Sequence, residues 1–312
     1  MSSEGGKGGK GGTATREPHI ITTTLLRDWA LPDAEGDKNS SGTVIVVGGN
    51  RGMPGAVLLA GQAAMRAGAG KLQLITVESV AAALGVSIPE AYVVGVAADG
   101  HGDLDGSAAE QIIEMAAEAD AVVIGPGIMS PEASNRLLGE VIPHLDCALS
   151  LDALGLAYLT DNLDGVKHLA GRTVLSPNAT ELFKTLGETA PTNLNSAQGR
   201  DTLVDATLRL ASTTGAVVVS GAEVSFIASP DGELWVDEGG GQGLAVSGSG
   251  DVKSGVIAGL LARGAAPEQA AVWAAAVHGR CGERLASAFG PRGFMASDLP
   301  PEIPAILAEL QA

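Results

Sequence analysis

Short runs of β-branched and other apolar residues alternate with longer Ala-rich runs from Thr43 onward. Short apolar runs between turn signals are typical of buried strands, and the longer runs are typical of helices. This alternation predicts an α/β fold in which helices cover both faces of a mostly parallel central sheet. The predicted strands are 43–47, 71–77, 121–125, 148–151, 173–175 and 216–220, followed by a hairpin of 226–229 and 233–236. The predicted helices are 56–67, 108–119, 196–213, 251–263 and 267–287.

The pattern continues along the chain without an internal repeat or an interdomain linker. A chain of 312 residues can bury about three quarters of its unfolded surface in one body, so we predict one domain over residues 18–312. Residues 1–17 are rich in Gly and Lys and lack an apolar stretch, which predicts a disordered tail and excludes a secretory signal of the usual kind. No apolar run reaches the ~18 residues that a membrane helix needs.

Charge and cysteine content narrow the classes of partner. The formal net charge of −17 argues against broad binding to DNA, RNA or anionic lipid, because the long-range field repels polyanions. A small anionic nucleotide stays compatible with this charge, since backbone amides and helix dipoles bind phosphate without a net positive charge. Cys147 and Cys281 lie far apart without ligand-like neighbours, which indicates neither a zinc site nor a disulfide and favours a reducing, cytoplasmic location.

The segment Gly248-Ser249-Gly250-Asp251 stands directly before a predicted helix. The two glycines allow backbone conformations that side chains forbid, so successive N–H groups can converge on one anion at the helix start. An acid in the first helical turn is favoured in its ionised form and can take a proton from a hydroxyl beside a bound phosphate. The alternative is that Ser249 or Asp251 only caps the helix.

Two further turns follow predicted strands, at the carboxyl edge where α/β sheets hold ligands. The first is the loop 48–55, Gly-Gly-Asn-Arg-Gly-Met-Pro-Gly, and the second is the turn Gly125-Pro126-Gly127. The loop lacks the Gly-Lys-Ser/Thr ending of a P-loop and is not a sound dinucleotide fingerprint. A tight connection without a ligand is an equally good interpretation of each turn.

Polar residues at other strand ends also have two interpretations. Asp152 can orient a substrate or reach a magnesium ion through water, or it can cap a helix. Asn178 and Glu181 stand three residues apart, as in a variant capping box, which is the interpretation that we favour. The five histidines show no metal-ligand spacing, and His278 is interpreted as a hydrogen-bonded helix residue.

Taken together, several segments resemble the ADP- or ATP-dependent NAD(P)H-hydrate dehydratases, a branch of the ribokinase-like fold. The resemblance covers the chain from about Ile21, and it rests on residues 47–56, 66–70, 89–91, 123–127 and 244–252. The order and spacing of the first and last of these segments are its most specific parts. The resemblance implies a three-layer sandwich with one catalytic domain.

The resemblance also implies a reaction, in which a nucleotide phosphorylates the hydroxyl on a hydrated nicotinamide ring and loss of phosphate restores the double bond. Asp251 is then the base, and the amides of Gly248, Ser249 and Gly250 form an anion hole for the phosphoryl group. The implied contacts to the hydrate are Ala56, Gly127, Asn178 and Asp251. The implied contacts to ADP or ATP are Ser220, Gly221, Ala222, Glu223, Val224 and Gly250. Mg²⁺ is the implied counter-charge, and a homo-oligomer the implied assembly.

Three positions depart from the family pattern. The family usually has His-Pro-Gly-Glu where this chain has 178–181, Asn-Ala-Thr-Glu, and Lys-Gly-Ala where it has 220–222, Ser-Gly-Ala. It has an apolar residue where Lys253 stands. Two other hypotheses therefore stay open: a small-molecule kinase of the same fold acting on a vitamin precursor or sugar alcohol, and a nucleotide-binding homologue with little turnover.

Overall fold

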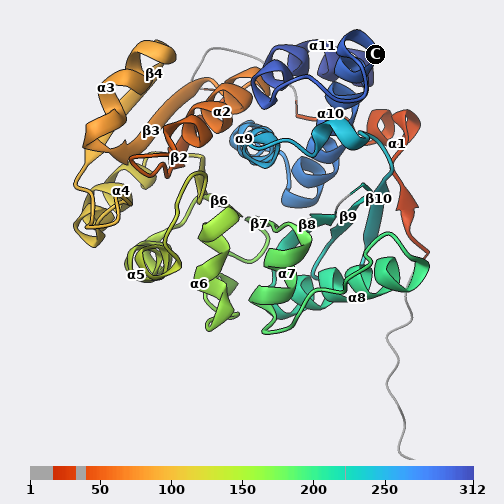
Figure 1. Ribbon diagram of the computed structural model, residues 1–312, viewed down its shortest axis with the longest axis horizontal. Coiled ribbons are helices and arrows are strands. Elements are labelled where there is room, and N and C mark those ends of the chain that lie inside the picture. The colour runs from red at the N-terminus through yellow and green to blue at the C-terminus, as the bar shows by residue number, and fades with distance from the viewer. Residues whose placement is uncertain (1–16, 33–39, 222) are drawn as a thin grey trace, which may run out of the picture.

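A ten-stranded sheet forms the centre of the molecule in the computed structural model, which describes residues 17–32, 40–221 and 223–312 (Figure 1). The predicted tail lies outside the described residues except for Glu17. The strand order is β1-β10-β9-β8-β7-β6-β5-β2-β3-β4, and neighbouring strands from β8 to β4 run parallel. The strands are β1 His19–Ile20, β2 Thr43–Val47, β3 Lys71–Val77, β4 Ala91–Val96, β5 Ala121–Ile124, β6 Ala148–Asp152, β7 Thr173–Ser176, β8 Val217–Gly221, β9 Ser225–Ala228 and β10 Leu234–Asp237.

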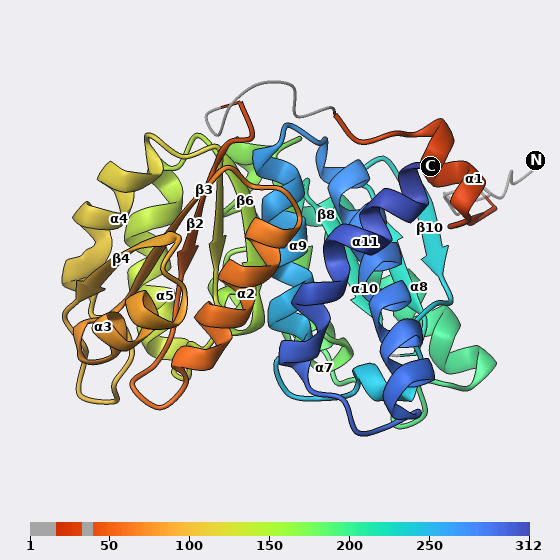
Figure 2. The same cartoon turned by 90° about the horizontal axis from the view of Figure 1, so that it is seen from above.

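Helices cover both faces of this sheet, as Figures 1 and 2 show. One layer contains α1 Thr23–Asp28, α2 Pro54–Arg66, α9 Ser249–Ala262, α10 Pro267–Phe289 and α11 Leu299–Gln311. The other contains α4 Ala109–Ala116, α5 Pro131–Val141, α6 Ala157–Thr160, α7 Ala179–Thr185 and α8 Ala197–Thr214, while α3 Glu78–Ser87 lies beside β4. No helix in the described part of the chain is long and apolar enough to cross a membrane. The predicted α/β sandwich is confirmed.

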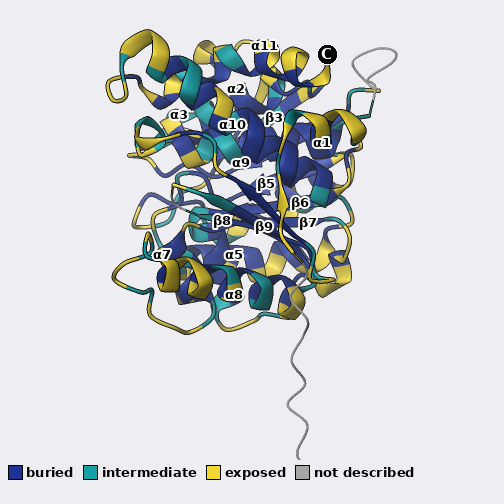
Figure 3. Ribbon diagram, turned by 90° about the vertical axis from the view of Figure 1, so that its right-hand side faces the viewer, coloured by how far each residue is buried: buried dark blue, intermediate teal, exposed yellow. Residues whose placement is uncertain are grey.

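The apolar core is divided by the sheet into two clusters. In β2, Val44 and Val46 belong to the cluster beneath α2, α9, α10 and α11, whereas Ile45 and Val47 belong to the cluster on the other side. All four side chains are fully buried, because successive residues of a strand point to opposite faces and both faces are covered. Central strands such as β5 are accordingly dark blue between two helical layers in Figure 3.

Helix α9 packs against α2 without intervening side chains. A Cβ atom on Gly255 would overlap the carbonyl oxygen of Ala60, and one on Gly259 would come within 2.5 Å of the carbonyl oxygen of Ala64. The two contacts are four residues apart in both helices, so the helices run parallel in matched register. The same register places Asp251, at the start of α9, opposite Ala56 in the first turn of α2.

The predicted elements are found within a few residues of their expected bounds. The predicted helix from residue 56 already begins at Pro54, because proline fits the first helical turn, where no amide partner is needed. The predicted helix 108–119 is shorter, since residues 106–108 form a 3₁₀ turn and α4 ends at Ala116. Strands β1 and β4 and helices α1, α3, α5, α6, α7 and α11 were not among the predicted elements.

Candidate functional site

The first glycine-rich loop and the Gly125–Gly127 turn lie side by side at the carboxyl edge of the sheet. Gly49 N donates to Pro126 O at 2.8 Å, and Asn50 N donates to Gly127 O at 2.9 Å. Asn50 is buried, and its Nδ2 donates to a carboxylate oxygen of Asp103 at 2.9 Å. The structure thus brings together two motifs that are about 75 residues apart in the sequence, as expected for the ends of adjacent parallel strands.

Two of the residues implied to contact the hydrate meet at this edge. Gly127 has a φ of +73°, and a Cβ atom there would lie 3.0 Å from the Cβ of Ala56 and 2.7 Å from the carbonyl oxygen of Met53. Only glycine fits a position with both a left-handed backbone and so little space. Ala56 is buried in the first turn of α2, so a larger side chain would disturb the same contact.

Two backbone amides at the start of α9 lack a hydrogen-bond partner among the described residues, and we call them open. Gly248 has a φ of +92° and stands before the helix, and Ser249 N donates to Val246 O at 3.2 Å. The amides of Gly250 and Asp251 have no hydrogen-bond partner in the described part of the chain. A Cβ atom on Gly250 would meet open space. Of the amides predicted to form an anion hole, that of Ser249 is occupied and that of Gly250 is open, and the amide of Asp251, which was not among them, is open as well.

His278 of α10 holds this turn in place. Its Nε2 lies 2.8 Å from Ser249 Oγ and 3.0 Å from Ser249 O. Burial, with a smaller effect of the nearby charge on Lys253, lowers the pKa of His278 to about 3, so the imidazole is neutral at physiological pH. The interpretation of His278 as a hydrogen-bonded helix residue is confirmed, and the bond ties α10 to the entrance of α9.

Asp251 is the titratable group beside the open amides. The predicted preference of Asp251 for its ionised form is wrong, because the side chain is partly buried and burial raises its pKa to about 7, with further contributions from the charges of Asp152 and Glu181. A carboxylate with a pKa near the working pH can both accept and release a proton, which is what general base catalysis requires. Such a perturbed group at a cleft is a candidate functional residue.

Asp152 connects α9 to the sheet. It is buried at the end of β6, where it accepts from Ser176 Oγ at 2.8 Å and from Ser254 Oγ at 3.0 Å. Asp152 stands at the N-cap position of the 3₁₀ helix Ala153–Leu156, as the capping interpretation expects, but its side chain makes no cap hydrogen bond. Burial raises its pKa, while these two hydroxyls and Lys253 oppose the shift.

Asn178 and Glu181 form the predicted capping box. Asn178 accepts from Glu181 N at 3.0 Å, and Asn178 N donates to the Glu181 carboxylate at 2.9 Å. Asn178 nevertheless also lies on the wall of a cavity, so its role as a contact to the hydrate stays a prediction.

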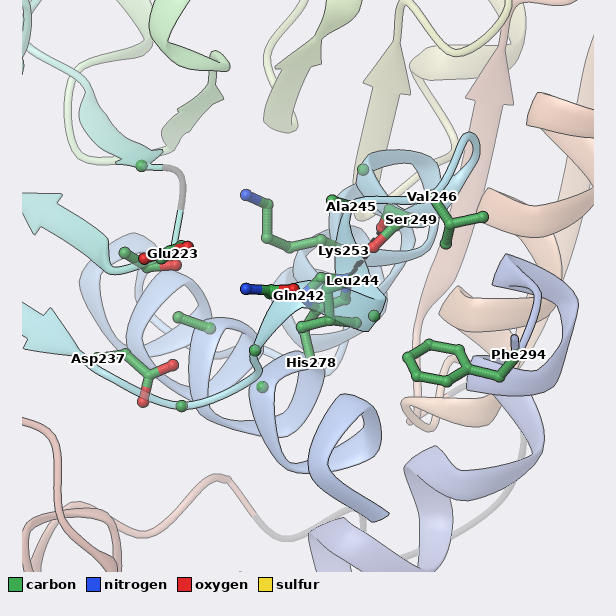
Figure 4. A pocket seen from close by; sticks show the side chains of 18 of the residues that line it. Glu223, Asp237, Gln242, Leu244, Ala245, Val246, Ser249, Lys253, His278 and Phe294 are labelled. Carbon is green, nitrogen blue, oxygen red and sulfur yellow. Dashed lines mark hydrogen bonds between the residues drawn. The ribbon is translucent and has the colours of Figure 1, made fainter. Parts of the chain in front are cut away.

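A cavity of about 840 Å³ opens on the other side of α9 from α2 (Figure 4). Its size is in the range of pockets for small ligands and cofactors, which is roughly 300–1,000 Å³. The walls come from the β8–β9 connection, the glycine-rich segment after β10, the starts of α7 and α9, the middle of α10 and the segment before α11. Its polar and charged side chains are Asn178, Glu223, Ser225, Asp237, Gln242, Ser249, Lys253, His278 and Arg292.

The structure places some, but not all, of the residues implied to bind the nucleotide on the cavity wall. Gly221, Glu223 and Gly250 line the cavity. Ser220 is fully buried, and its hydroxyl lies 2.6 Å from that of Thr207 in α8, so the side chain points away from the cavity. Val224 packs against the core, and Ala222 lies outside the described residues.

Most of the cavity wall was not identified from the sequence. The segment after β10 carried a signal, because a run of glycines over 239–243 is typical of a backbone that approaches a ligand closely. Arg292 and Phe294 belong to a segment far along the chain and carried none. Lys253 was noticed as a departure from a family pattern.

Comparison with known proteins gives a consistent result. The family model described as NAD(P)H-hydrate dehydratase matches residues 44–305. An ADP-dependent (S)-NAD(P)H-hydrate dehydratase from Xanthomonas campestris is 40% identical over 292 residues, which are 93% of this chain and 96% of that relative.

Solved structures agree with this match. The ADP/ATP-dependent NAD(P)H-hydrate dehydratase from Bacillus subtilis, crystallised with ATP and Mg²⁺, superposes with a TM-score of 0.74 at 28% identity, covering 94% of this chain and 99% of that one. A ribokinase-like superfamily protein from Enterococcus faecalis has a TM-score of 0.77 at 22% identity over 94% of this chain and 97% of that one, which confirms the predicted ribokinase-like fold. The chain belongs to the NAD(P)H-hydrate dehydratase family.

Proposed function

We propose that this protein is an ADP- or ATP-dependent (S)-NAD(P)H-hydrate dehydratase, a carbon–oxygen lyase that repairs hydrated NADH and NADPH. The observation that carries the proposal is the position of Asp251. The carboxyl group stands beside the open amides of α9, its pKa is about 7, and the register of α2 and α9 places it opposite Ala56. Gly250, the residue before it, lines the nucleotide-sized cavity.

Helix α9 thus separates two sides of one site. Gly250 and Ser249 face the cavity, where the nucleotide is proposed to bind, and Asp251 continues the face of α9 that packs on α2. The hydrate is proposed to bind on that second side, against Ala56 and Gly127. The ring hydroxyl of the hydrate and the terminal phosphoryl group of the nucleotide then meet at the start of α9.

The proposed reaction has two steps. Ionised Asp251 takes the proton of the ring hydroxyl as its oxygen attacks the terminal phosphorus of the nucleotide, and the shortened nucleotide leaves. The amides of Gly250 and Asp251, at the positive end of the α9 dipole, stabilise the charge on the transferring group. Loss of the new phosphate, together with a proton from the neighbouring ring carbon, then restores the double bond of NAD(P)H.

Mg²⁺ is proposed as the counter-ion of the nucleotide. No group of three or more His, Cys, Asp or Glu side chains among the described residues is arranged to hold a metal ion. Magnesium does not require such a group, because it usually keeps several waters and is held by substrate phosphates with one or two carboxylates. Glu181 and Asp152 are the carboxylates beside Asp251 and are the proposed protein partners, and the ion would neutralise phosphate charge there.

Substitution of Asp251 by Asn tests the proposal, because it keeps the shape of the side chain and removes the base. The wild-type protein, given hydrated NADH, ADP and Mg²⁺, should restore the absorbance of the reduced nicotinamide. In Asp251→Asn, we expect kcat to fall about 10²- to 10⁴-fold, the usual contribution of a general base. Nucleotide affinity, measured by calorimetry, should change little.

The matched control is Asp161→Asn, an exposed residue at the end of α6. It should have wild-type turnover. Equal turnover in wild type and Asp251→Asn would refute the assignment of the base. A stable phosphorylated alcohol with no recovery of NADH would instead support a small-molecule kinase, and nucleotide binding without any turnover would support a binding protein.

A further inference from the structure

One face of helix α9 forms part of the cavity wall. Ser249, Gly250 and Lys253 all line the cavity, and Gly250 and Lys253 are three residues apart, so they are neighbours on that face. Side chains in helices lean toward the N-terminus, which brings the Lys253 ammonium toward the open amides. Figure 4 shows the Lys253 side chain extending from α9 into the cavity.

The Lys253 ammonium has no hydrogen bond and no ion pair within the described part of the chain. Burial lowers the pKa of Lys253, whereas the charges of Asp152 and Glu181 favour its protonated form, and neither carboxylate forms an ion pair with it within the described residues. Asp152 accepts from Ser176 and Ser254, and Glu181 accepts from Asn178 N. An ammonium group has three donors, and leaving them unpaired in a partly buried position is costly unless a ligand accepts them.

The other basic groups of the cavity serve different purposes. Arg292 donates to Gln242 Oε1 at 2.9 Å. His278 is neutral and bonded to Ser249. Ser220 offers no charge, and its hydroxyl bonds Thr207. Among the described lining residues, Lys253 is therefore the cation on the face of α9 that carries the open amides.

We propose that Lys253 binds the terminal phosphoryl group of the nucleotide, together with the amides of Gly250 and Asp251. The inference rests on the function proposed above and adds a residue to it. The ammonium approaches the phosphoryl oxygens from the cavity side, while Asp251 approaches the hydroxyl from the α2 side. Lys253 therefore contributes both to nucleotide affinity and to stabilising the group in transfer.

The test is a series of nucleotides of increasing length. The dissociation constants of adenosine, AMP, ADP and ATP are measured by calorimetry at fixed Mg²⁺, with wild type, Lys253→Met and the control Lys71→Met. Lys71 is exposed at the beginning of β3, outside the cavity wall. Melting temperatures show whether each variant folds, and Lys253→Gln, which keeps a polar end, replaces Lys253→Met if the latter does not.

We expect the loss of affinity in Lys253→Met to grow with the number of phosphates. ADP and ATP should bind about 10- to 100-fold more weakly, as for the loss of one hydrogen bond to a charged group, and adenosine should bind as in wild type. Lys71→Met should bind all four ligands as wild type does. Turnover of the hydrate at saturating ADP should also fall, because the same contact acts during transfer.

Two results would overturn the inference: ADP binding within twofold of wild type, or an equal loss for adenosine and ADP, which a purely structural role would give. The function itself is measured separately, as hydrate turnover by the wild-type protein. A phosphate-dependent loss without any hydrate turnover would leave Lys253 a phosphate ligand and refute the dehydratase. Hydrate turnover by the wild-type protein, together with unchanged ADP binding in Lys253→Met, would support the dehydratase and refute the role of Lys253.

Discussion

The proposed role of Asp251 as the base predicts that the rate of hydrate repair depends on pH near neutrality. Burial favours the neutral carboxylic acid, and the nearby carboxylates Asp152 and Glu181 add to the effect, so the pKa lies at about 7 instead of the ordinary 3.8. The base must be ionised to accept a proton. We therefore expect activity to rise with pH through this pKa and to be lost as the pH falls below it.

The magnitude follows from the titration. With a pKa of about 7, about a tenth of the protein carries ionised Asp251 at pH 6 and about nine tenths at pH 8, so kcat/KM should rise roughly tenfold over this range. A carboxyl with the ordinary pKa of 3.8 would be more than about 99% ionised throughout, and the profile would be flat.

The assay measures kcat/KM for hydrated NADH from pH 5.5 to 8.5 with saturating ADP and Mg²⁺, since this parameter reports groups in the nucleotide-bound protein before the hydrate binds. The second ionisation of a phosphate group, with a pKa of about 6, can give a similar rising limb in the plot of kcat/KM against pH. Glu181→Gln separates the two sources. It keeps an acceptor for Asn178 N and removes one of the charges that raise the pKa of Asp251, so the limb should move to lower pH.

Asp152→Asn should move the limb in the same direction, while the pKa of the free nucleotide is the same for all variants. Lys253 and His278 are the other titratable groups of this cluster. His278, with a pKa of about 3, stays neutral over the range, and burial lowers the pKa of Lys253. A flat profile in the wild type, or a limb that neither variant moves, would refute the reasoning.

Two glycine positions give further predictions. Gly250→Val should fold as wild type does, because a Cβ atom there meets open space, but nucleotide affinity should fall at least about tenfold, the equivalent of about 1.4 kcal/mol, since the side chain fills the space beside the open amide. Unchanged nucleotide affinity in a calorimetric titration would refute the placement of the phosphate at this position. Gly125→Ala should lower the free energy of unfolding in urea by about 1–3 kcal/mol or more, because φ is +128° and the new methyl group would overlap the carbonyl oxygen of Asp152. Stability equal to wild type would show that the turn relaxes at no cost.

The sequence predicted the sheet where strands are buried on both faces. Thr43–Val47 and Ala121–Ile124 read as uninterrupted apolar runs because both faces of each strand meet helices. β4 was not predicted, since it lies at an edge, Tyr92 is exposed and Gly95 interrupts the run. β1 has two residues, and its pairing with β10 depends on the fold and not on its own pattern.

The start of α9 was predictable for a different reason. Glycines next to an acid at a helix entrance are a local signal, and the turn around Gly248 depends on backbone conformations that the residues themselves allow. What this pattern does not contain is which amides stay open. That depends on Val246 O, which accepts from Ser249, and on His278, which comes from another helix.

The remaining parts of the site depend on the rotation of α9 about its own axis, and that rotation is fixed by packing. Gly255 and Gly259 must face α2, because any side chain there would collide with its backbone. Once this face is set, Asp251 continues it, whereas Gly250 and Lys253 are turned to the cavity and Ser254 to Asp152. The close contact between two helices thus decides which side of α9 carries the proposed base and which side carries the ammonium. A sequence read one segment at a time gives the residues of this helix but not the surface that each of them meets.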